Sequence, residues 1–268
     1  MENWSLVGKG MTAEVYKWEN DKVLKLFSEK YDIDRVLREA EIGKAVHRAA
    51  APAPAVYEII NVDGRYGIEF QRIFGSSMLA HIKAEPWKLF YFAQQLARLH
   101  YRIHQCTSDE LPSQSDRLSF VIEKSSGRLG EKKKSIIEYL DSLPGGISIC
   151  HGDLHFNNVI ISDKGLVAVD WNGAYKGNPL GDVTRTYLMM NSPSAQPGAP
   201  KIVIRMSRFL KRLASWIYLA EYMRISNIRF DKIDEWVLPI AAAKLKDRAP
   251  GNDKWLIRII NKRCSQLT

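Results

Sequence analysis

Three side chains at fixed spacing could do chemistry in this chain of 268 residues. The segment 151–158 reads His-Gly-Asp-Leu-His-Phe-Asn-Asn and offers the carboxylate of Asp153 and the amide of Asn158. A second carboxylate, Asp170, follows a short hydrophobic hairpin. Phosphoryl transfer needs such a set, because one Asp orients and deprotonates an attacking hydroxyl while an Asn and another Asp hold the Mg²⁺ that bridges the nucleotide phosphates. We therefore expect Asp153 to be catalytic, and Asn158 and Asp170 to bind the metal.

A glycine-containing turn near the start of the chain is a candidate phosphate site. Residues 8–15 read Gly-Lys-Gly-Met-Thr-Ala-Glu-Val, and a strand-like run continues straight out of the turn. That favours a flap whose backbone N–H groups lie over phosphates, rather than a dinucleotide-binding unit in which the glycines open a helix. An ordinary glycine hairpin is the alternative. We expect Gly8, Gly10 and Val15 to border the nucleotide.

Lys25 stands in the middle of an apolar strand, between Leu24 and Leu26. An ammonium in such surroundings is costly without an anionic partner. Glu39, on the helix expected to follow, is the first candidate partner, and Glu41 is the second. In a functional role, the ammonium of Lys25 would contact the α- and β-phosphates, and Glu39 would hold it in position. The alternative is a lysine on an edge strand that extends to solvent.

Other polar residues are candidates for supporting roles. His151 is expected to bond to the backbone rather than to a metal, and His155 either faces the phosphates or supports its loop. Asp182, near the start of a helix, is expected to cap that helix or to brace the catalytic loop. His100 and His104 lie one helical turn apart, a metal-ligand spacing, but their apolar neighbours favour a core position over zinc binding.

The net charge of +9 is unevenly distributed along the chain. From residue 183 onward there are 16 Lys and Arg against 6 Asp and Glu, so this part carries +10 and the preceding residues carry −1. A set of solvated helix faces is one explanation. The other is a field that attracts an anionic ligand or surface.

The pattern of apolar residues predicts an α+β chain of two lobes, residues 1–74 and residues 75–268, joined near 71–75. The first lobe reads as β-rich with one helix, which carries Ile33, Val36, Leu37 and Ala40 on one face and stops before two prolines. A second hairpin is expected across Asp63-Gly64. Beyond residue 75 the pattern is mostly helical, with a buried helix over 86–104. Three strand segments are expected in the first lobe: Leu6–Gly8, Glu14–Trp18 and Val23–Phe27.

Several partner classes are not indicated by the sequence. No apolar run approaches the roughly 18 residues that span a bilayer, so no membrane partner is expected. The tryptophans show no basic-aromatic rhythm, so no nucleic acid is expected. Three scattered cysteines match no ligand spacing and read as free thiols in a reducing cytoplasm. Monomer and homodimer both stay open.

Together these residues resemble the aminoglycoside phosphotransferase and choline kinase superfamily, whose fold is similar to that of eukaryotic protein kinases. The specific part of the match is His-Gly-Asp-Leu-x-x-x-Asn with a downstream Asp-Trp. The resemblance implies a bilobal kinase-like fold, Mg²⁺ and ATP as cofactors (with GTP open), and adenine contacts from the backbone of Gln71 and Ile73. One departure is Phe156-Asn157, where the family often has Pro-Gly.

The resemblance implies an ATP-dependent phosphotransferase that moves the γ-phosphate to a hydroxyl of a small molecule. The acceptor could be an antibiotic such as an aminoglycoside, or an amino-alcohol or sugar metabolite. Family members that act on polycationic aminoglycosides generally look acidic where substrate binds, whereas the C-terminal third of this chain is basic. A local acidic pocket stays open. Two alternatives are a non-catalytic nucleotide-binding regulatory module and a Ser/Thr protein kinase, although no activation segment is evident. Four residues could line an acidic pocket: Glu221, Asp231, Asp234 and Glu235.

Overall fold

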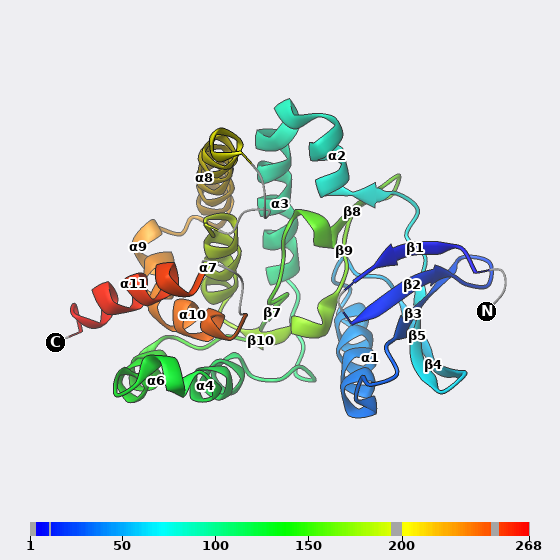
Figure 1. Cartoon of the computed structure of the whole chain (residues 1–268), viewed down its shortest axis with the longest axis horizontal. Helices are drawn as coiled ribbons and strands as arrows, with labels where there is room; N and C mark the ends of the chain where they lie inside the picture. Colours follow the sequence, from blue (N-terminus) through cyan, green and yellow to red (C-terminus); the bar gives the residue numbers. More distant parts are fainter. Residues whose placement is uncertain (1–3, 11, 194–199, 248–251, 268) are drawn as a thin grey trace.

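The chain has an α+β fold, with a β-sheet in its N-terminal part and mainly helices in its C-terminal part (Figure 1). The computed structural model describes residues 4–10, 12–193, 200–247 and 252–267. The N-terminal sheet has five strands in the order β1-β2-β3-β5-β4, and every neighbouring pair is antiparallel. Its strands are β1 (Leu6–Lys9), β2 (Ala13–Lys17), β3 (Lys22–Phe27), β4 (Val56–Val62) and β5 (Arg65–Gln71).

A tight turn determines the register of the β4–β5 pair. The β4–β5 hairpin turns through two residues, Asp63 (φ +50°) and Gly64 (φ +83°), and closes on the pair Val62 and Arg65. Two consecutive residues with positive φ give the turn whose twist matches that of the strands it joins. The hairpin expected from Asp63-Gly64 is therefore confirmed.

Helix α1 (Ile33–Arg48) packs against this sheet and contacts both β4 and β5. Asp32 caps its N-terminus through the N–H of Asp34. Val36 and Ala40 are buried as expected, but Leu37 is exposed, so its predicted place on the buried face is wrong. The buried face also includes Gly43, whose missing side chain lets Val56 of the sheet approach closely. This places the contact face on the other side of Val36 from Leu37.

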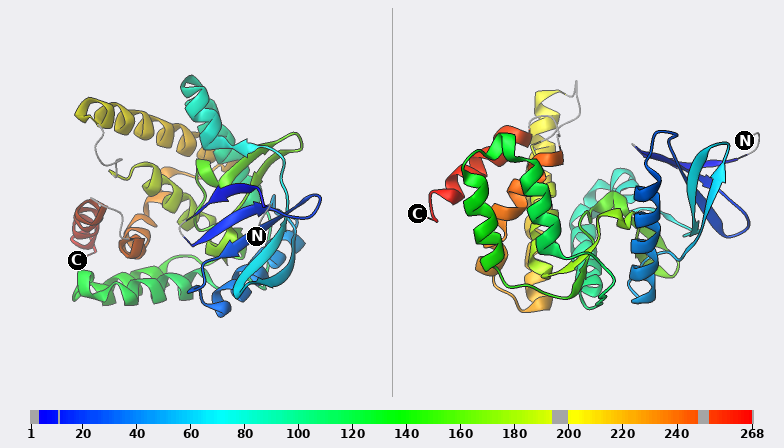
Figure 2. Two further views of the ribbon diagram at one scale, coloured as in Figure 1. Left: turned by 45° about the vertical axis from the view of Figure 1, so that its right-hand side comes forward. Right: turned by 90° about the horizontal axis from the view of Figure 1, so that it is seen from below.

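The C-terminal part is built on helices that run beside one another (Figures 1 and 2). The expected helix over 86–104 is a 3₁₀ turn (Pro86–Lys88) followed by α3 (Leu89–His104). The longest helix, α8 (Lys201–Ser226), packs on α3. The other α-helices are α2 (Met78–Ala84), α4 (Gln114–Lys124), α5 (Ser126–Leu129), α6 (Lys132–Ser142), α7 (Pro179–Met190), α9 (Phe230–Asp234), α10 (Val237–Lys244) and α11 (Asn252–Cys264).

Short strands lie between the sheet and these helices. β6 (Ser76–Ser77) pairs with β8 (Val159–Ser162), β8 pairs with β9 (Gly165–Ala168), and β7 (Ser148–Cys150) pairs with β10 (Tyr175–Gly177). The chain thus passes directly from the end of β5 at Gln71 to a strand of the C-terminal part. The lobe boundary at residues 74 and 75 stays a prediction.

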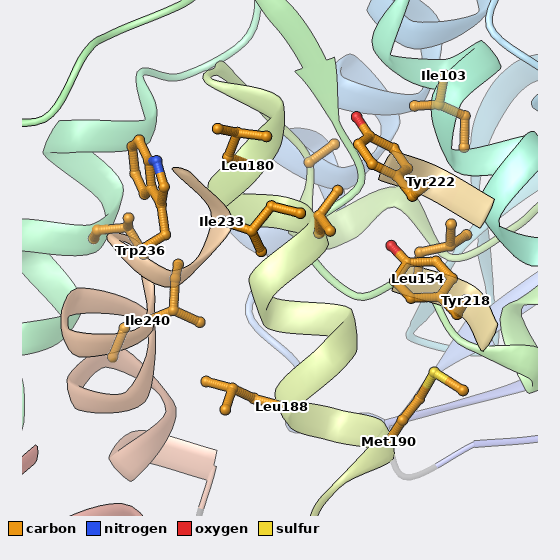
Figure 3. Close-up of a cluster of buried hydrophobic side chains, with 14 of the residues drawn as sticks. Ile103, Leu154, Leu180, Leu188, Met190, Tyr218, Tyr222, Ile233, Trp236 and Ile240 are labelled. Carbon is orange, nitrogen blue, oxygen red and sulfur yellow. The ribbon is translucent and has the colours of Figure 1, made fainter. Parts of the chain in front are cut away.

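One hydrophobic core fills the C-terminal part, and Figure 3 shows a portion of it. Tyr218 and Tyr222 of α8 are the largest fully buried side chains, and they lie near Leu154 and Ile103 in that view. Burial of each such aromatic ring removes on the order of 150–250 Å² from water. Their hydroxyls need hydrogen-bond partners there, and those partners lie at the candidate site.

Candidate active site

The segment that carries Asp153 is a loop between β7 and β8, and its shape depends on Gly152. Gly152 has φ +76°, and a Cβ atom there would lie 2.1 Å from the carbonyl oxygen of Gly173. Only glycine fits both conditions, because other residues rarely adopt this backbone conformation and the carbonyl leaves no room for a side chain. The loop therefore packs directly on the backbone that follows Asp170.

Asp182, near the start of α7, is a buried carboxylate that holds this loop. Its Oδ2 accepts the backbone N–H of His151 at 2.6 Å, and its Oδ1 accepts that of Gly152 at 2.9 Å. Burial disfavours its charge, but the electrostatic attraction of His100 and the hydrogen bonds from His100 and His104 outweigh that effect and hold the pKa of Asp182 well below its usual range. The helix N-cap is Asn178, so the capping alternative for Asp182 is wrong.

His100 and His104 connect Asp182 to α8. Their Nε2 atoms lie 2.9 and 3.4 Å from Asp182 Oδ2, and their Nδ1 atoms lie 2.6 and 2.7 Å from the hydroxyls of Tyr218 and Tyr222. Each ring nitrogen thus has a protein partner. Burial, with repulsion from His100, lowers the pKa of His104 to about 4, so His104 is neutral at pH 7. His100 and His104 lie in the core, as their apolar neighbours predicted, and form a hydrogen-bonded network with Asp182. Their ligand atoms and a carboxylate oxygen of Asp182 lie within 4.8 Å of one another, so the expectation that no zinc binds there stays a prediction.

Asn158 and Asp170 lie next to each other because the carbonyl of Asn158 accepts the N–H of Val169 at 2.9 Å. The side-chain Nδ2 of Asn158 donates to the carbonyl of Asp153 at 3.1 Å, which turns its Oδ1 away from that bond. Asp170 has a left-handed backbone (φ +66°), and its carboxylate is 42% exposed. One amide oxygen and one accessible carboxylate suit Mg²⁺, which prefers oxygen ligands and retains several waters.

Lys25 links the sheet, α1 and the Asp170 loop. Its Nζ lies 2.6 Å from Glu39 Oε1 and 3.0 Å from Asp170 Oδ1. Burial disfavours the ammonium, but the attraction of both carboxylates outweighs it and raises the pKa of Lys25. Burial raises the pKa of Glu39, whose second oxygen has no hydrogen-bond partner among the described residues. Glu41, the second candidate, is exposed, so the predicted pairing with Glu39 is confirmed.

The carboxylate of Asp153 has two basic neighbours. Its Oδ2 lies 3.7 Å from Nε2 of His155, and its Oδ1 lies 3.6 Å from Nη2 of Arg185. The Nδ1 of His155 accepts the N–H of Asn157, so its Nε2 carries the proton that faces Asp153. Sequence reasoning missed Arg185, although its position three residues after Asp182 on the same helix could have indicated it.

His151 is buried beneath the loop, and both of its ring nitrogens bond to the backbone. Its Nδ1 accepts the N–H of Asp153, and its Nε2 donates to the carbonyl of Val169 at 3.1 Å. Burial lowers the pKa of His151, so the ring stays neutral. The expected backbone role is confirmed, and the bond to Val169 ties the Asp153 loop to the segment that carries Asp170.

The remaining nucleotide candidates lie on the sheet. Gly8 lies within β1 opposite Val15, and Gly10 follows the end of β1, where its N–H donates to the carbonyl of Ala13. Val15 on β2 is the cross-strand neighbour of Lys25. Gln71 ends β5 and donates its N–H to the carbonyl of Ala55, and Ile73 follows two residues later. The roles of these residues toward a nucleotide stay predictions.

The four acidic residues considered for an acceptor pocket all pair with basic side chains of the same chain. Glu221 is nearly buried and bonds to both Arg98 and Arg224. The remaining three form these pairs: Asp231 with Arg229, Asp234 with Arg263, and Glu235 with Lys232. Their negative charge is therefore largely compensated within the protein.

Comparison with known proteins identifies the family of this chain and the fold that it shares. The sequence matches the phosphotransferase enzyme family over residues 3–205. The fold is similar to an aminoglycoside-3'-phosphotransferase of type VIII (15% identity, TM-score 0.60, covering 90% of this chain and 93% of that one). It is also similar to a putative fructosamine-3-kinase from Haemophilus somnus 129PT (14%, 0.60, 97% and 90%) and to an amicoumacin kinase solved with AMP-PNP and Ca²⁺ (11%, 0.57, 99% and 89%). The resemblance drawn from the sequence is confirmed, and the chain belongs to the phosphotransferase enzyme family.

Proposed function

We propose that this protein transfers the γ-phosphate of Mg²⁺-ATP to a hydroxyl group of a small molecule. The observation that carries the proposal is the pair of contacts made by Lys25, 2.6 Å from Glu39 and 3.0 Å from Asp170. They bring a cation that could contact phosphates to the carboxylate that could bind the metal, although these two residues are 145 positions apart. Bound Mg²⁺ would neutralise charge on the phosphates.

Each residue has a defined task in this proposal. Asp153 accepts the proton of the acceptor hydroxyl, and Asn158 Oδ1 with the carboxylate of Asp170 holds the metal. Lys25 contacts the phosphates and leaves Asp170 when nucleotide binds, while Glu39 keeps its ammonium in position. Electrostatic stabilisation of the phosphates, rather than covalent chemistry, is the main contribution that a protein makes to this reaction.

The acceptor is expected to be neutral or anionic rather than a polycation. Support comes from the internal pairing of Glu221 and the other acidic candidates, which leaves little uncompensated negative charge for an aminoglycoside. The excess of basic residues after position 183 acts in the same direction, although only charges within about a Debye length (~8 Å) of the pocket contribute.

The test is γ-phosphate transfer by the purified protein to a panel of sugars, amino-alcohols and antibiotics. Asp153→Asn should lose at least 10²-fold in kcat, on the order of a general-base contribution, while Mg²⁺-ATP binding persists. Asp163→Asn, the same change at an exposed loop position, should keep full activity. Undiminished transfer by Asp153→Asn would remove Asp153 from its role. Nucleotide binding without transfer to any acceptor would favour a regulatory module, and phosphate incorporation into proteins alone would favour a protein kinase.

A further inference from the structure

The first half of α8 presents an exposed apolar surface. Residues 201–213 form a regular helix in which no residue is buried, whereas the second half, from Ala214 onward, packs into the core. In both views of Figure 2 the yellow N-terminal half of α8 extends to the edge of the molecule. Isolated helices of about 12–15 residues are only marginally stable in water. A helix half without buried residues therefore gains stability if a partner covers it.

The exposed apolar residues of this half form a stripe that continues to Trp216 in the next turn. A helix turns by about 100° per residue, so apolar positions at i, i+4, i+7, i+11 and i+14 fall within an arc of about 80°. These side chains are between 38% and 65% exposed. An exposed apolar patch of this continuity marks an interaction surface. The stripe consists of Ile202, Met206, Phe209, Leu213 and Trp216, with Val203 beside it.

The charges around the stripe indicate the partner. Residues 201–216 contain five basic side chains and no acidic one. Arg205 and Arg212 fall along one flank of the stripe, on the helical-wheel geometry above. A second copy of the helix would bring basic residues against basic residues with no carboxylate to compensate, so self-association through this face is disfavoured. The five basic residues are Lys201, Arg205, Arg208, Lys211 and Arg212.

We propose that the first half of α8 binds the surface of an anionic lipid bilayer, with its apolar stripe inserted at the level of the headgroups. A helix with an apolar face that contains Trp, Phe and Leu, and with a polar face rich in Lys and Arg, is typical of helices that lie in the membrane interface. Trp216 closes the stripe, and its ring contacts Phe230 and Tyr187 of the protein core. The contact thus joins the bilayer-facing stripe to the folded body.

Binding to a membrane surface does not require a membrane-spanning helix. The sequence predicts no spanning segment, and no helix in the described ranges is long and apolar enough to cross a bilayer. A helix in the interface plane needs no span, because only one of its faces enters the lipid. The proposal departs from the expectation that no membrane partner binds, because that expectation considered only segments long enough to span a bilayer.

Flotation of the full-length protein with lipid vesicles tests the proposal. The wild-type protein should float with vesicles of 30% phosphatidylglycerol and 70% phosphatidylcholine, and should remain unbound with pure phosphatidylcholine. Met206→Glu/Phe209→Glu should reduce binding by roughly tenfold or more, because two inserted side chains are replaced by carboxylates. Arg205→Gln/Arg212→Gln should reduce it by roughly 25-fold, at about fivefold per basic residue near the surface, and 0.5 M NaCl should weaken wild-type binding.

The matched control is Phe120→Glu, which replaces a similarly exposed aromatic residue on α4. Figure 1 shows α4 on the opposite side of the C-terminal part from the first half of α8. The Phe120→Glu variant should float like the wild-type protein. All variants change exposed residues, so their circular dichroism and thermal shift with Mg²⁺-ATP should match the wild type. No flotation of the wild type, equal binding to neutral vesicles, or unchanged binding by the double Glu variant would each overturn the proposal. The proposal would also be overturned if the wild-type protein did not bind vesicles but formed a dimer, and if Met206→Glu/Phe209→Glu converted that dimer to monomers. None of these outcomes depends on catalysis.

Discussion

Replacement of Asp182 by Asn would test how the catalytic loop is held. The carboxylate accepts backbone N–H groups through both oxygens, from His151 at 2.6 Å and from Gly152 at 2.9 Å, and Oδ2 also faces two histidines. An amide has only one oxygen, so in either orientation its NH₂ group points at a donor that was previously satisfied. The less costly orientation leaves the N–H of Gly152 without an acceptor.

The expected destabilisation follows from these contacts. A buried donor that loses its partner costs about 1–3 kcal/mol, and hydrogen bonds to a charged acceptor are about twice as strong as neutral ones. Asp182→Asn should therefore lower the free energy of unfolding by about 3 kcal/mol or more. For a chain of this size that corresponds to a fall in Tm of roughly 6–12 °C. Displacement of the loop by an ångström should lower kcat by up to about 10²-fold while nucleotide binding changes less.

Urea unfolding and steady-state kinetics of Asp182→Asn, with Asp163→Asn as the control, measure both effects. Asp163 is exposed in a loop and bonds only to the N–H of Lys164 among the described residues, so the same change there should be neutral. If Asp182→Asn proves too unstable to purify, Tyr218→Phe offers a milder change: it removes one hydroxyl from His100 and should cost about 1 kcal/mol. A variant at Asp182 as stable and active as the control would refute the reasoning.

Three further predictions follow from the same geometry. Lys25→Met should weaken Mg²⁺-ATP binding by more than roughly tenfold in a nucleotide titration, and it should lower stability by about 1–3 kcal/mol because Glu39 is left buried without its partner. The pKa of His104, about 4 against the ordinary 6.5, means that its stabilisation is complete above pH 6.5 and is lost as the pH falls toward 4. Unfolding free energy should fall by about 3 kcal/mol over that interval through this group, and the fall should be smaller in His104→Gln. Gly152→Ala should abolish turnover and lower Tm, since its Cβ would meet a carbonyl oxygen at 2.1 Å, whereas Gly145→Ala, with open space around it, should leave both unchanged.

Local sequence patterns were sufficient to select the candidate site residues, whose roles stay predictions. Asp153 and Asn158 share one loop, and a lysine between two leucines needs an anion wherever the chain folds. Glu39 could be chosen because a helix must cover the small sheet, and it is the acidic residue on the buried face. Glu41, two positions along the same helix, points to solvent instead. These inferences depended on short-range patterns and on the energetic cost of buried charge.

Long-range partners could not be predicted in the same way. Tyr218 and Tyr222 bond to histidines 118 positions earlier in the chain, and in the sequence they differ little from other aromatic core residues. Their spacing of four residues matches that of His100 and His104, so two helices in contact present the two pairs in register. That match has meaning only once the two helices are known to pack together. The prediction that Leu37 is buried was wrong for a related reason. Periodicity identifies the apolar face of a helix, but it does not say how much of that face contacts the sheet.

Helix α8 shows why apolar periodicity alone does not identify a partner. Both halves of this helix carry apolar residues at helical spacing, but the second half meets α3 and the first half meets solvent. The charged residues of the two halves indicate which half packs within the protein and which half has an external partner. In the second half the nearly buried Glu221 is matched by Arg98 and Arg224, so the protein compensates its own charge. Residues 201–216 contain five basic side chains and no acidic one. A surface that supplies both apolar contact and negative charge would match the apolar stripe and these basic residues at the same time.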